Sequence, residues 1–194
     1  MNSESQPRTS QEFIQRLLSP QRDGTLDMLS ILSFSEISHR DRVAEIGCGP
    51  GYFTPRLAKA LMDGKLYALD TDEEMLAACR QRVTAARLGN VEVQRCGEFD
   101  FTLEEGSLDG VFLAFVVHES PDCPRFLQSI RRLLKPRGWV TVLNWHRRES
   151  ENGPPLERRI DPETMRQMVR EAGFRYRTWR DLNGEQYMMT LRNR

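Results

Sequence analysis

Three glycines and one acidic residue stand close together after the first short apolar run of the chain. Residues 45–51 read EIGCGPG, with glycines at positions 47, 49 and 51. Glycines let the backbone turn tightly and approach a ligand without side chains in the way. A dinucleotide fingerprint needs glycine at position 52, where this chain has tyrosine, and the lysine of a phosphate-binding Walker loop is missing. The carboxylate of Glu45 repels pyrophosphate and suits a ligand that carries an ammonium group.

Two further acidic residues follow the next predicted strands. Asp70 ends the second strand, where a carboxylate can accept hydrogen bonds from both ribose hydroxyls of a nucleoside. Glu98 and Phe99 follow the third strand, where a carboxylate can accept from an adenine amino group and a ring can pack on the base. The three acidic residues therefore suit a nucleoside that bears a cation and no phosphate.

Histidine and arginine side chains gather after the fourth and fifth predicted strands. His118 follows the fourth strand, and its unperturbed pKa suits proton transfer near neutrality, although it can equally serve to shape a pocket. Trp145 and His146 follow the fifth strand and are candidates for contact with a substrate. Residues 147–159 form a long loop with Arg147, Arg148, Arg158 and Arg159, so the segment is either a functional lid or a solvated basic connector.

The elements that must position these residues alternate between strands and helices. Short apolar runs predict strands at residues 43–46, 66–69, 91–93, 108–117 and 139–145. Helical spacing and stop signals predict helices at residues 52–62, 72–87 and 122–134, and a last helix from Asp161 to Gly173. Asn183-Gly184 predicts a hairpin between residues 174–182 and 186–191. Such alternation is typical of an α/β fold, a mostly parallel sheet that binds ligands beyond the carboxyl ends of its strands.

The segment before the first strand is expected to be helical. Residues 11–18 and a stretch that opens near residues 23–25 have helical spacing, and the polar residues 1–9 are expected to fray. We therefore divide the chain into an N-terminal helical extension, residues 1–39, and a main domain, residues 40–194. The helices of this extension, residues 10–34, are expected to cover the substrate pocket and, with the loop after the fifth strand, to set specificity.

Composition limits the functional classes. The 194 residues suffice for one sizeable core, and 28 basic residues balance 28 acidic ones, which disfavours a nucleic-acid or membrane-surface binder. The balance hides a split: residues 1–120 hold 12 basic and 19 acidic side chains, whereas residues 121–180 hold 14 and 7. Neither a membrane span nor a secretory signal is visible, so we expect a cytoplasmic protein with free thiols. The four cysteines form no CxxC pair, and we expect no metal site.

Several motifs follow one another in a recognisable order: EIGCGPG at 45–51, LD at 69–70, ML at 75–76, LDGV at 108–111 and LLKPRGW at 133–139. Over roughly residues 40–192 the sequence resembles the class I S-adenosylmethionine-dependent methyltransferases. More narrowly, it is similar to small stand-alone proteins related to the quinone-biosynthesis C-methyltransferases. The resemblance implies a Rossmann-like, doubly wound sheet of seven strands, with an antiparallel strand 7 between strands 5 and 6.

The resemblance also implies a set of residues around S-adenosylmethionine. The methionine part would lie among Glu45, Gly47, Cys48, Gly49 and Gly51. The ribose would be held by Asp70, with Thr71 and Met75 flanking the adenosine. The adenine would be bordered by Gly97, Glu98 and Phe99, and the sulfonium side by Ala114 and Phe115. The chain departs from many relatives at Gly97-Glu98, where they have Gly-Asp, so the carboxylate here is carried on a longer side chain.

The leading hypothesis is methyl transfer from S-adenosylmethionine to a small-molecule acceptor. The methyl group is already activated, so the protein mainly supplies alignment and exclusion of water. A base is required only if the acceptor must lose a proton, and His118 is the candidate. Two alternatives stay open: a protein that binds S-adenosylmethionine without catalysis, as a sensor or partner subunit, and a nicotinamide-dependent oxidoreductase, which Tyr52 disfavours.

Overall fold

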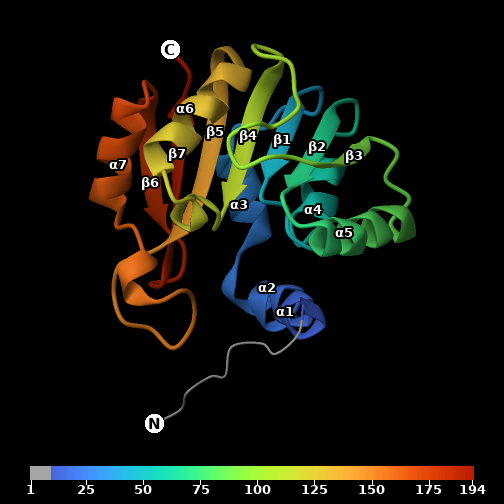
Figure 1. Cartoon of the computed structure of the whole chain (residues 1–194), viewed down its shortest axis with the longest axis horizontal. Helices are drawn as coiled ribbons and strands as arrows, with labels where there is room; N and C mark the ends of the chain where they lie inside the picture. The colour runs from blue at the N-terminus through green and yellow to red at the C-terminus, as the bar shows by residue number, and fades with distance from the viewer. Residues whose placement is uncertain (1–9) are drawn as a thin grey trace.

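A computed structural model of the chain describes residues 10–194, which form a seven-stranded sheet covered by helices (Figure 1). The strand order is β3-β2-β1-β4-β5-β7-β6. The strands are β1 Arg42–Ile46, β2 Lys65–Asp70, β3 Val91–Arg95, β4 Leu108–Ala114, β5 Leu134–Trp145, β6 Arg175–Asp181 and β7 Gln186–Arg192. Strands β1 to β5 pair in parallel, whereas β7 runs antiparallel to both β5 and β6. The predicted Rossmann-like α/β sheet, with its antiparallel strand between the fifth and sixth, is confirmed.

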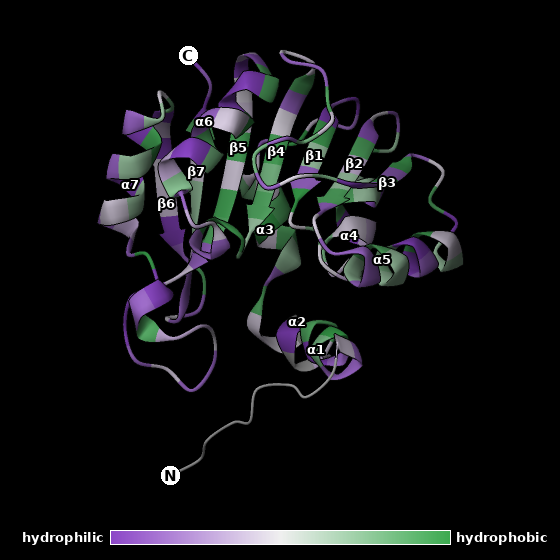
Figure 2. Cartoon of the chain, viewed as in Figure 1, coloured by the Kyte–Doolittle hydropathy of each residue, from purple (hydrophilic) through white to green (hydrophobic). Residues whose placement is uncertain are grey.

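Helices pack on both faces of the sheet. On one face lie α3 Met28–Phe34, α4 Thr54–Ala60 and α5 Glu73–Ala85, and on the other lie α6 Cys123–Leu133 and α7 Pro162–Glu171. Because side chains alternate along a strand, Val43 of β1 packs in the core with Ile31 and Leu57, whereas Ala44 packs with Leu127. The central strands are accordingly apolar (Figure 2). The core therefore has two layers, one on each side of the sheet.

The C-terminal hairpin shows how position in the sheet selects residue type. Every residue of β7 from Gln186 to Leu191 is buried, because β7 has a neighbouring strand on each side. In β6, by contrast, six of the seven residues are exposed, and three of them are arginines: Arg175, Arg177 and Arg180. Charged side chains on an edge strand discourage pairing with other chains. The polar pattern of β6 thus follows from its place at the rim.

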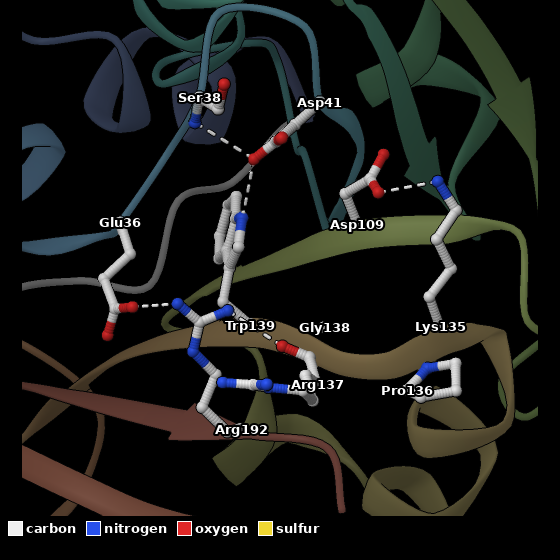
Figure 3. Close-up of a pocket in the computed structure, with 10 residues that line it drawn as sticks. All are labelled: Glu36, Ser38, Asp41, Asp109, Lys135, Pro136, Arg137, Gly138, Trp139 and Arg192. Carbon is white, nitrogen blue, oxygen red and sulfur yellow. Dashed lines mark hydrogen bonds and ion pairs between the residues drawn. The ribbon is translucent and has the colours of Figure 1, made fainter.

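Polar groups at the amino ends of the strands pair with one another around a hollow of about 220 Å³ (Figure 3). Trp139 Nε1 donates to Asp41 Oδ2 at 2.9 Å, and the same oxygen accepts from the backbone N–H of Ser38 at 3.0 Å. Lys135 Nζ donates to Asp109 Oδ1 at 2.6 Å. These contacts tie the segment before β1 to β4 and β5, so this hollow is part of the fold's framework.

Several element boundaries differ from the sequence-based expectation; strand β4, for example, ends at Ala114 and not at residue 117, where a short helix η1 Val117–Glu119 begins. The second N-terminal helix is two helices, α2 Gln21–Thr25 and α3, because Asp27 caps α3 by accepting from Leu29 N at 3.1 Å and Ser30 N at 3.2 Å. Helix α4 begins at residue 54 and leaves Tyr52 and Phe53 in the preceding loop. Strand β5 begins at residue 134, where a bulge in its pairing with β4 precedes the expected start at residue 139.

The N-terminal segment begins with α1 Ser10–Leu17. Together with α2, this helix lies beyond the carboxyl ends of the strands, at the bottom of Figure 1. Leu26 and Ile31, further along the segment, are buried in the core against the sheet. The first nine residues of the predicted extension lie outside the described residues.

Candidate active site

A cleft of about 1630 Å³ lies beyond the carboxyl ends of the strands. Its walls come from the loops that follow β1 to β5, from α1 and α2, and from the 146–161 segment with its short helix η2 Leu156–Arg158. The chain leaves β1 toward one edge of the sheet and returns at β4 toward the other, so the cleft opens where the strand order reverses. This is the position where open α/β sheets bind their ligands.

Most of the residues predicted to form the site line this cleft. Twelve of them do so: Gly47, Cys48, Gly49, Asp70, Thr71, Met75, Gly97, Glu98, Ala114, Phe115, His118 and Trp145. Four others lie outside its lining: Glu45, Gly51, Phe99 and His146. Each of these four has a local physical reason for its position.

The glycine loop has a left-handed backbone at all three glycines, with φ of 71°, 54° and 82° at Gly47, Gly49 and Gly51. A Cβ at Gly47 would lie 2.6 Å from Val116 Cγ2, and one at Gly51 would lie 3.0 Å from Cys79 Sγ. A Cβ at Gly49 would meet nothing within 4 Å. Gly47 and Gly51 therefore allow the loop to pack closely, whereas Gly49 keeps the cleft open beside Asp70.

Asp70 lines the cleft with a carboxylate that two backbone N–H groups hold in place. Its Oδ2 accepts from the backbone N–H of Gly49 at 2.7 Å, and its Oδ1 accepts from that of Asp72 at 3.0 Å. Burial raises the pKa of Asp70, while these backbone donors lower it. A carboxylate has about four acceptor sites, so about two stay available, the number that a ribose diol requires.

Glu45 lies beneath the glycine loop and not in the cleft. Its side chain is 1% exposed, and Thr54 Oγ1 donates to its Oε2 at 2.6 Å. Burial raises the pKa of this carboxyl well above its ordinary value. The strand alternation explains the position: Glu45 shares the face of Val43, which packs against α3 and α4. The same alternation in the sequence would have indicated it.

On the predicted adenine side, Glu98 lines the cleft and is exposed, whereas Phe99 turns away from it. The guanidinium of Arg125 lies 4.3 Å from the centroid of the Phe99 ring, a cation–π contact on the surface of α6. The ring that lines the cleft is Phe101, which is 3% exposed. Sequence reasoning named Phe99 and did not name Phe101.

His118 is held between two acceptors. Its Nδ1 lies 2.9 Å from Asn144 Oδ1, and its Nε2 lies 3.0 Å from Glu119 Oε1. The backbone N–H of Trp145 also donates to Asn144 Oδ1 at 2.8 Å, which fixes that amide as an acceptor. The hydrogen bond from His118 lowers the pKa of Glu119, and Glu119 also pairs with Arg158.

An aromatic wall, made of Tyr52, Phe53, Phe115 and Trp145, also lines the cleft. The Phe115 ring lies 5.6 Å from that of Trp145 and 6.4 Å from that of Phe53. The guanidinium of Arg22 lies 4.3 Å from the Tyr52 ring centroid and 5.6 Å from that of Phe115. Phe115 has φ of 61°, a conformation that bulky residues rarely adopt and that concentrates at functional sites. Sequence reasoning missed Tyr52, Phe53 and Arg22, because it placed the two rings on a helix.

The basic loop divides between the cleft and the surface. Arg158 and Arg159 line the cleft, whereas Arg147 and Arg148 do not, and Arg148 pairs with Asp181 at 3.2 Å. His146 also binds Asp181, through Nε2 at 2.9 Å, and packs near the Tyr187 ring beneath the β6–β7 hairpin. Burial lowers the pKa of His146, and the charge of Arg148 adds to this effect.

Two further observations concern the described residues alone. No group of three His, Cys, Asp or Glu side chains within them is placed to hold a metal ion. None of the helices found between residues 10 and 194 combines the length and the apolar character that a membrane crossing requires.

Comparison with known proteins agrees with this geometry. A methyltransferase-domain family matches residues 43–138. Demethylmenaquinone methyltransferase of Bacillus mycoides (strain KBAB4) is 32% identical over 109 residues, which cover 56% of this chain and 46% of that protein. The match therefore spans about half of that relative's length.

Solved structures match over more of the chain. An S-adenosylmethionine-dependent methyltransferase from Aquifex aeolicus has a TM-score of 0.91 and 26% identity, over 97% of this chain and 100% of that one. Phosphoethanolamine N-methyltransferase 2 of Haemonchus contortus, in complex with S-adenosylmethionine, has the same fold, with a TM-score of 0.78 and 15% identity over 95% of this chain and 57% of that one.

Fold, motif order and relatives define the class: a Rossmann-like α/β protein that binds S-adenosylmethionine. The chain belongs to the class I S-adenosylmethionine-dependent methyltransferases. The cleft fits that cofactor, because Asp70 keeps free acceptor sites, Gly49 leaves open space beside it, and Met75 and Glu98 line the same end.

Proposed function

We propose that the chain transfers the methyl group of S-adenosylmethionine to a small planar acceptor bound against the aromatic wall. One observation carries the proposal: a single cleft has two chemically different ends. Asp70, Asp72 and Glu98 line the cleft after β2 and β3, whereas Phe115 and Trp145 of the aromatic wall follow β4 and β5, on the other side of β1. The Arg22 guanidinium lies over the rings of this wall. The first end suits a cationic nucleoside, and the second suits a flat ring. The name of the Bacillus mycoides relative supports a quinol-type acceptor.

The chain's own residues supply alignment. Bound S-adenosylmethionine provides an activated methyl group that an in-line nucleophile can displace. Asp70 fixes the ribose end, and Ala114 and Phe115 at the end of β4 border the space between the two ends. The N-terminal helices and the 146–161 segment line the cleft, and their role in this proposal is to exclude water from it.

His118 receives a positioning role in this proposal. Its two nitrogens already bind Asn144 and Glu119, so proton transfer from an acceptor requires one of these contacts to break. Glu119 contacts both His118 and Arg158, so the three side chains fasten η2 to the end of β4. We expect His118→Gln to weaken acceptor binding without abolishing turnover.

Thermal shift with cofactor separates the proposed enzyme from other classes. A ligand at 100 times its Kd stabilises a protein by about 2.7 kcal/mol, which corresponds to roughly 5–10 °C for a chain of this size. We expect this shift with S-adenosylmethionine or S-adenosylhomocysteine and none with NAD. Formation of S-adenosylhomocysteine across a panel of quinols, phenols, amines and thiols then identifies the acceptor. A shift without turnover on any of them would support a silent binding module, and a shift with NAD alone would overturn the assignment.

A further inference from the structure

A buried cation lines the acceptor end of the cleft. Arg159 is 6% exposed and lies at the end of η2. Its guanidinium donates to four oxygens: Nε to Pro154 O at 2.8 Å, Nη1 to Arg148 O and Ser150 Oγ, each at 2.7 Å, and Nη2 to Asn152 O at 2.6 Å. All four acceptors are neutral.

The positive charge of Arg159 is therefore uncompensated within the described part of the chain, where no carboxylate forms an ion pair with it. A buried charge is costly unless an opposite charge accompanies it. A guanidinium has five N–H donors, and four are engaged, so one N–H on Nη2 stays available. Arg159 thus offers both a net charge and a directed donor.

A flat ring lies beside this cation. The guanidinium of Arg159 lies 5.5 Å from the ring centroid of Trp145, which also lines the cleft. Gly153, with φ of 96°, brings the loop onto the same indole, because a Cβ there would lie 2.8 Å from the ring. The cation and the ring are consequently held together by the loop that Arg159 organises.

The other charged side chains at the acceptor end of the cleft do not take the place of Arg159 beside Trp145. The neighbouring Arg158 is exposed and already paired with Glu119. Glu149 and Glu151 line the cleft from the same loop but are exposed, so water screens them. Glu185, which is half-buried, lines the cleft from the β6–β7 turn, and it too has no ion pair with Arg159.

We infer that Arg159 binds an anionic oxygen of the methyl acceptor, a carboxylate or a phenolate, while Trp145 packs on the acceptor's ring. This inference rests on the proposed function, because it assigns a substrate class to the same cleft. It narrows the class of methyl acceptor from planar molecules in general to planar aromatic anions. An arginine that only pinned the loop would confer no preference for charge.

Matched ligand pairs test the inference in the protein saturated with S-adenosylhomocysteine. The first pair is 4-hydroxybenzoate and 4-hydroxybenzamide, which differ in charge but hardly in shape. The second is 4-nitrophenol, which ionises near neutral pH, and 4-nitroaniline, which stays neutral. We expect calorimetry to give about 10- to 100-fold tighter binding of the anion in at least one pair, the effect of one hydrogen bond between charged groups. The pair that shows the preference distinguishes a carboxylate from a phenolate.

The variant Arg159→Gln should reduce that preference to less than about threefold, whereas Arg148→Gln, an exposed arginine of the same loop, should leave it unchanged. If Arg159→Gln does not fold, the wild-type preference and its weakening with added NaCl provide the test. No preference for either anion in the wild-type protein, or a preference that survives in Arg159→Gln, would overturn the inference. Loss of S-adenosylhomocysteine binding itself would instead contradict the proposed function.

Discussion

Replacing Asp70 by alanine tests the assignment of the cofactor end most directly. The carboxylate already accepts two backbone N–H groups, so its remaining acceptor sites match the two hydroxyls of a ribose. A hydrogen bond to a charged group contributes about 1.5–3 kcal/mol, and two contribute about 3–6 kcal/mol. At 1.4 kcal/mol for each tenfold change, Asp70→Ala should raise the Kd of S-adenosylhomocysteine by about 10²- to 10⁴-fold.

The assay is isothermal titration calorimetry, with Asp109→Ala as a matched control. Like Asp70, Asp109 accepts a hydrogen bond from a backbone N–H, that of Arg42 at 2.9 Å, and neither residue caps a helix. Asp109 lies at the opposite end of the sheet from the cleft. Both variants should fold, as judged by circular dichroism, and the control should bind S-adenosylhomocysteine like the wild type. If the Kd of Asp70→Ala lies within threefold of the control's, the assignment of Asp70 to the ribose is refuted.

Three further predictions concern the packing and the buried ionisable groups. Gly110→Ala places a Cβ 2.0 Å from the Trp139 ring and should lower the free energy of unfolding, measured in urea, by about 3 kcal/mol or more. Gly89→Ala is the control: with open space around its Cβ, it should change the free energy of unfolding by under about 0.5 kcal/mol. Burial raises the pKa of Glu45 above 4.5, so the ligand-free fold favours the protonated acid and loses stability as the pH rises. The gain in Tm of Glu45→Gln over the wild type should therefore grow from pH 5 to pH 8. A difference in Tm that stays constant over this range would contradict the prediction. The lowered pKa of His146 makes the fold favour the neutral ring, so wild-type stability should fall as the pH drops below 6.5, and His146→Asn should flatten that slope in thermal melts.

Much of the scaffold was predictable, because its signals are local and periodic. The apolar runs gave the strands, and Asn183-Gly184 gave the hairpin that ends with the antiparallel β7. The boundaries that differ depend on tertiary contacts. Strand β5 starts at residue 134 because Leu134 pairs with Leu108, a contact between residues far apart in the sequence.

The site was predictable where backbone conformation determines it and less so where side chains meet across the fold. The glycine loop and Asp70 follow from spacing within one strand–helix–strand unit, β1-α4-β2. The partners of His118 and Glu45 do not, because Asn144 lies 26 residues away on β5 and Thr54 follows a loop whose path the sequence leaves open. Arg22 contacts the aromatic wall from the N-terminal segment, and no periodic pattern in the sequence predicts such a contact.

The placement of β7 has a consequence for how the chain is made. Strand β6 leaves the ribosome before β7, yet β7 is the strand that joins it to β5. Until β7 is inserted, β5 carries an unpaired edge and the apolar strand β7 has no partner. Such edges are prone to aggregation, and pairing that must wait for later residues slows folding. The nascent protein therefore inserts β7 between two strands that precede it in the sequence. Chaperones would benefit it most in the time between synthesis of β6 and insertion of β7.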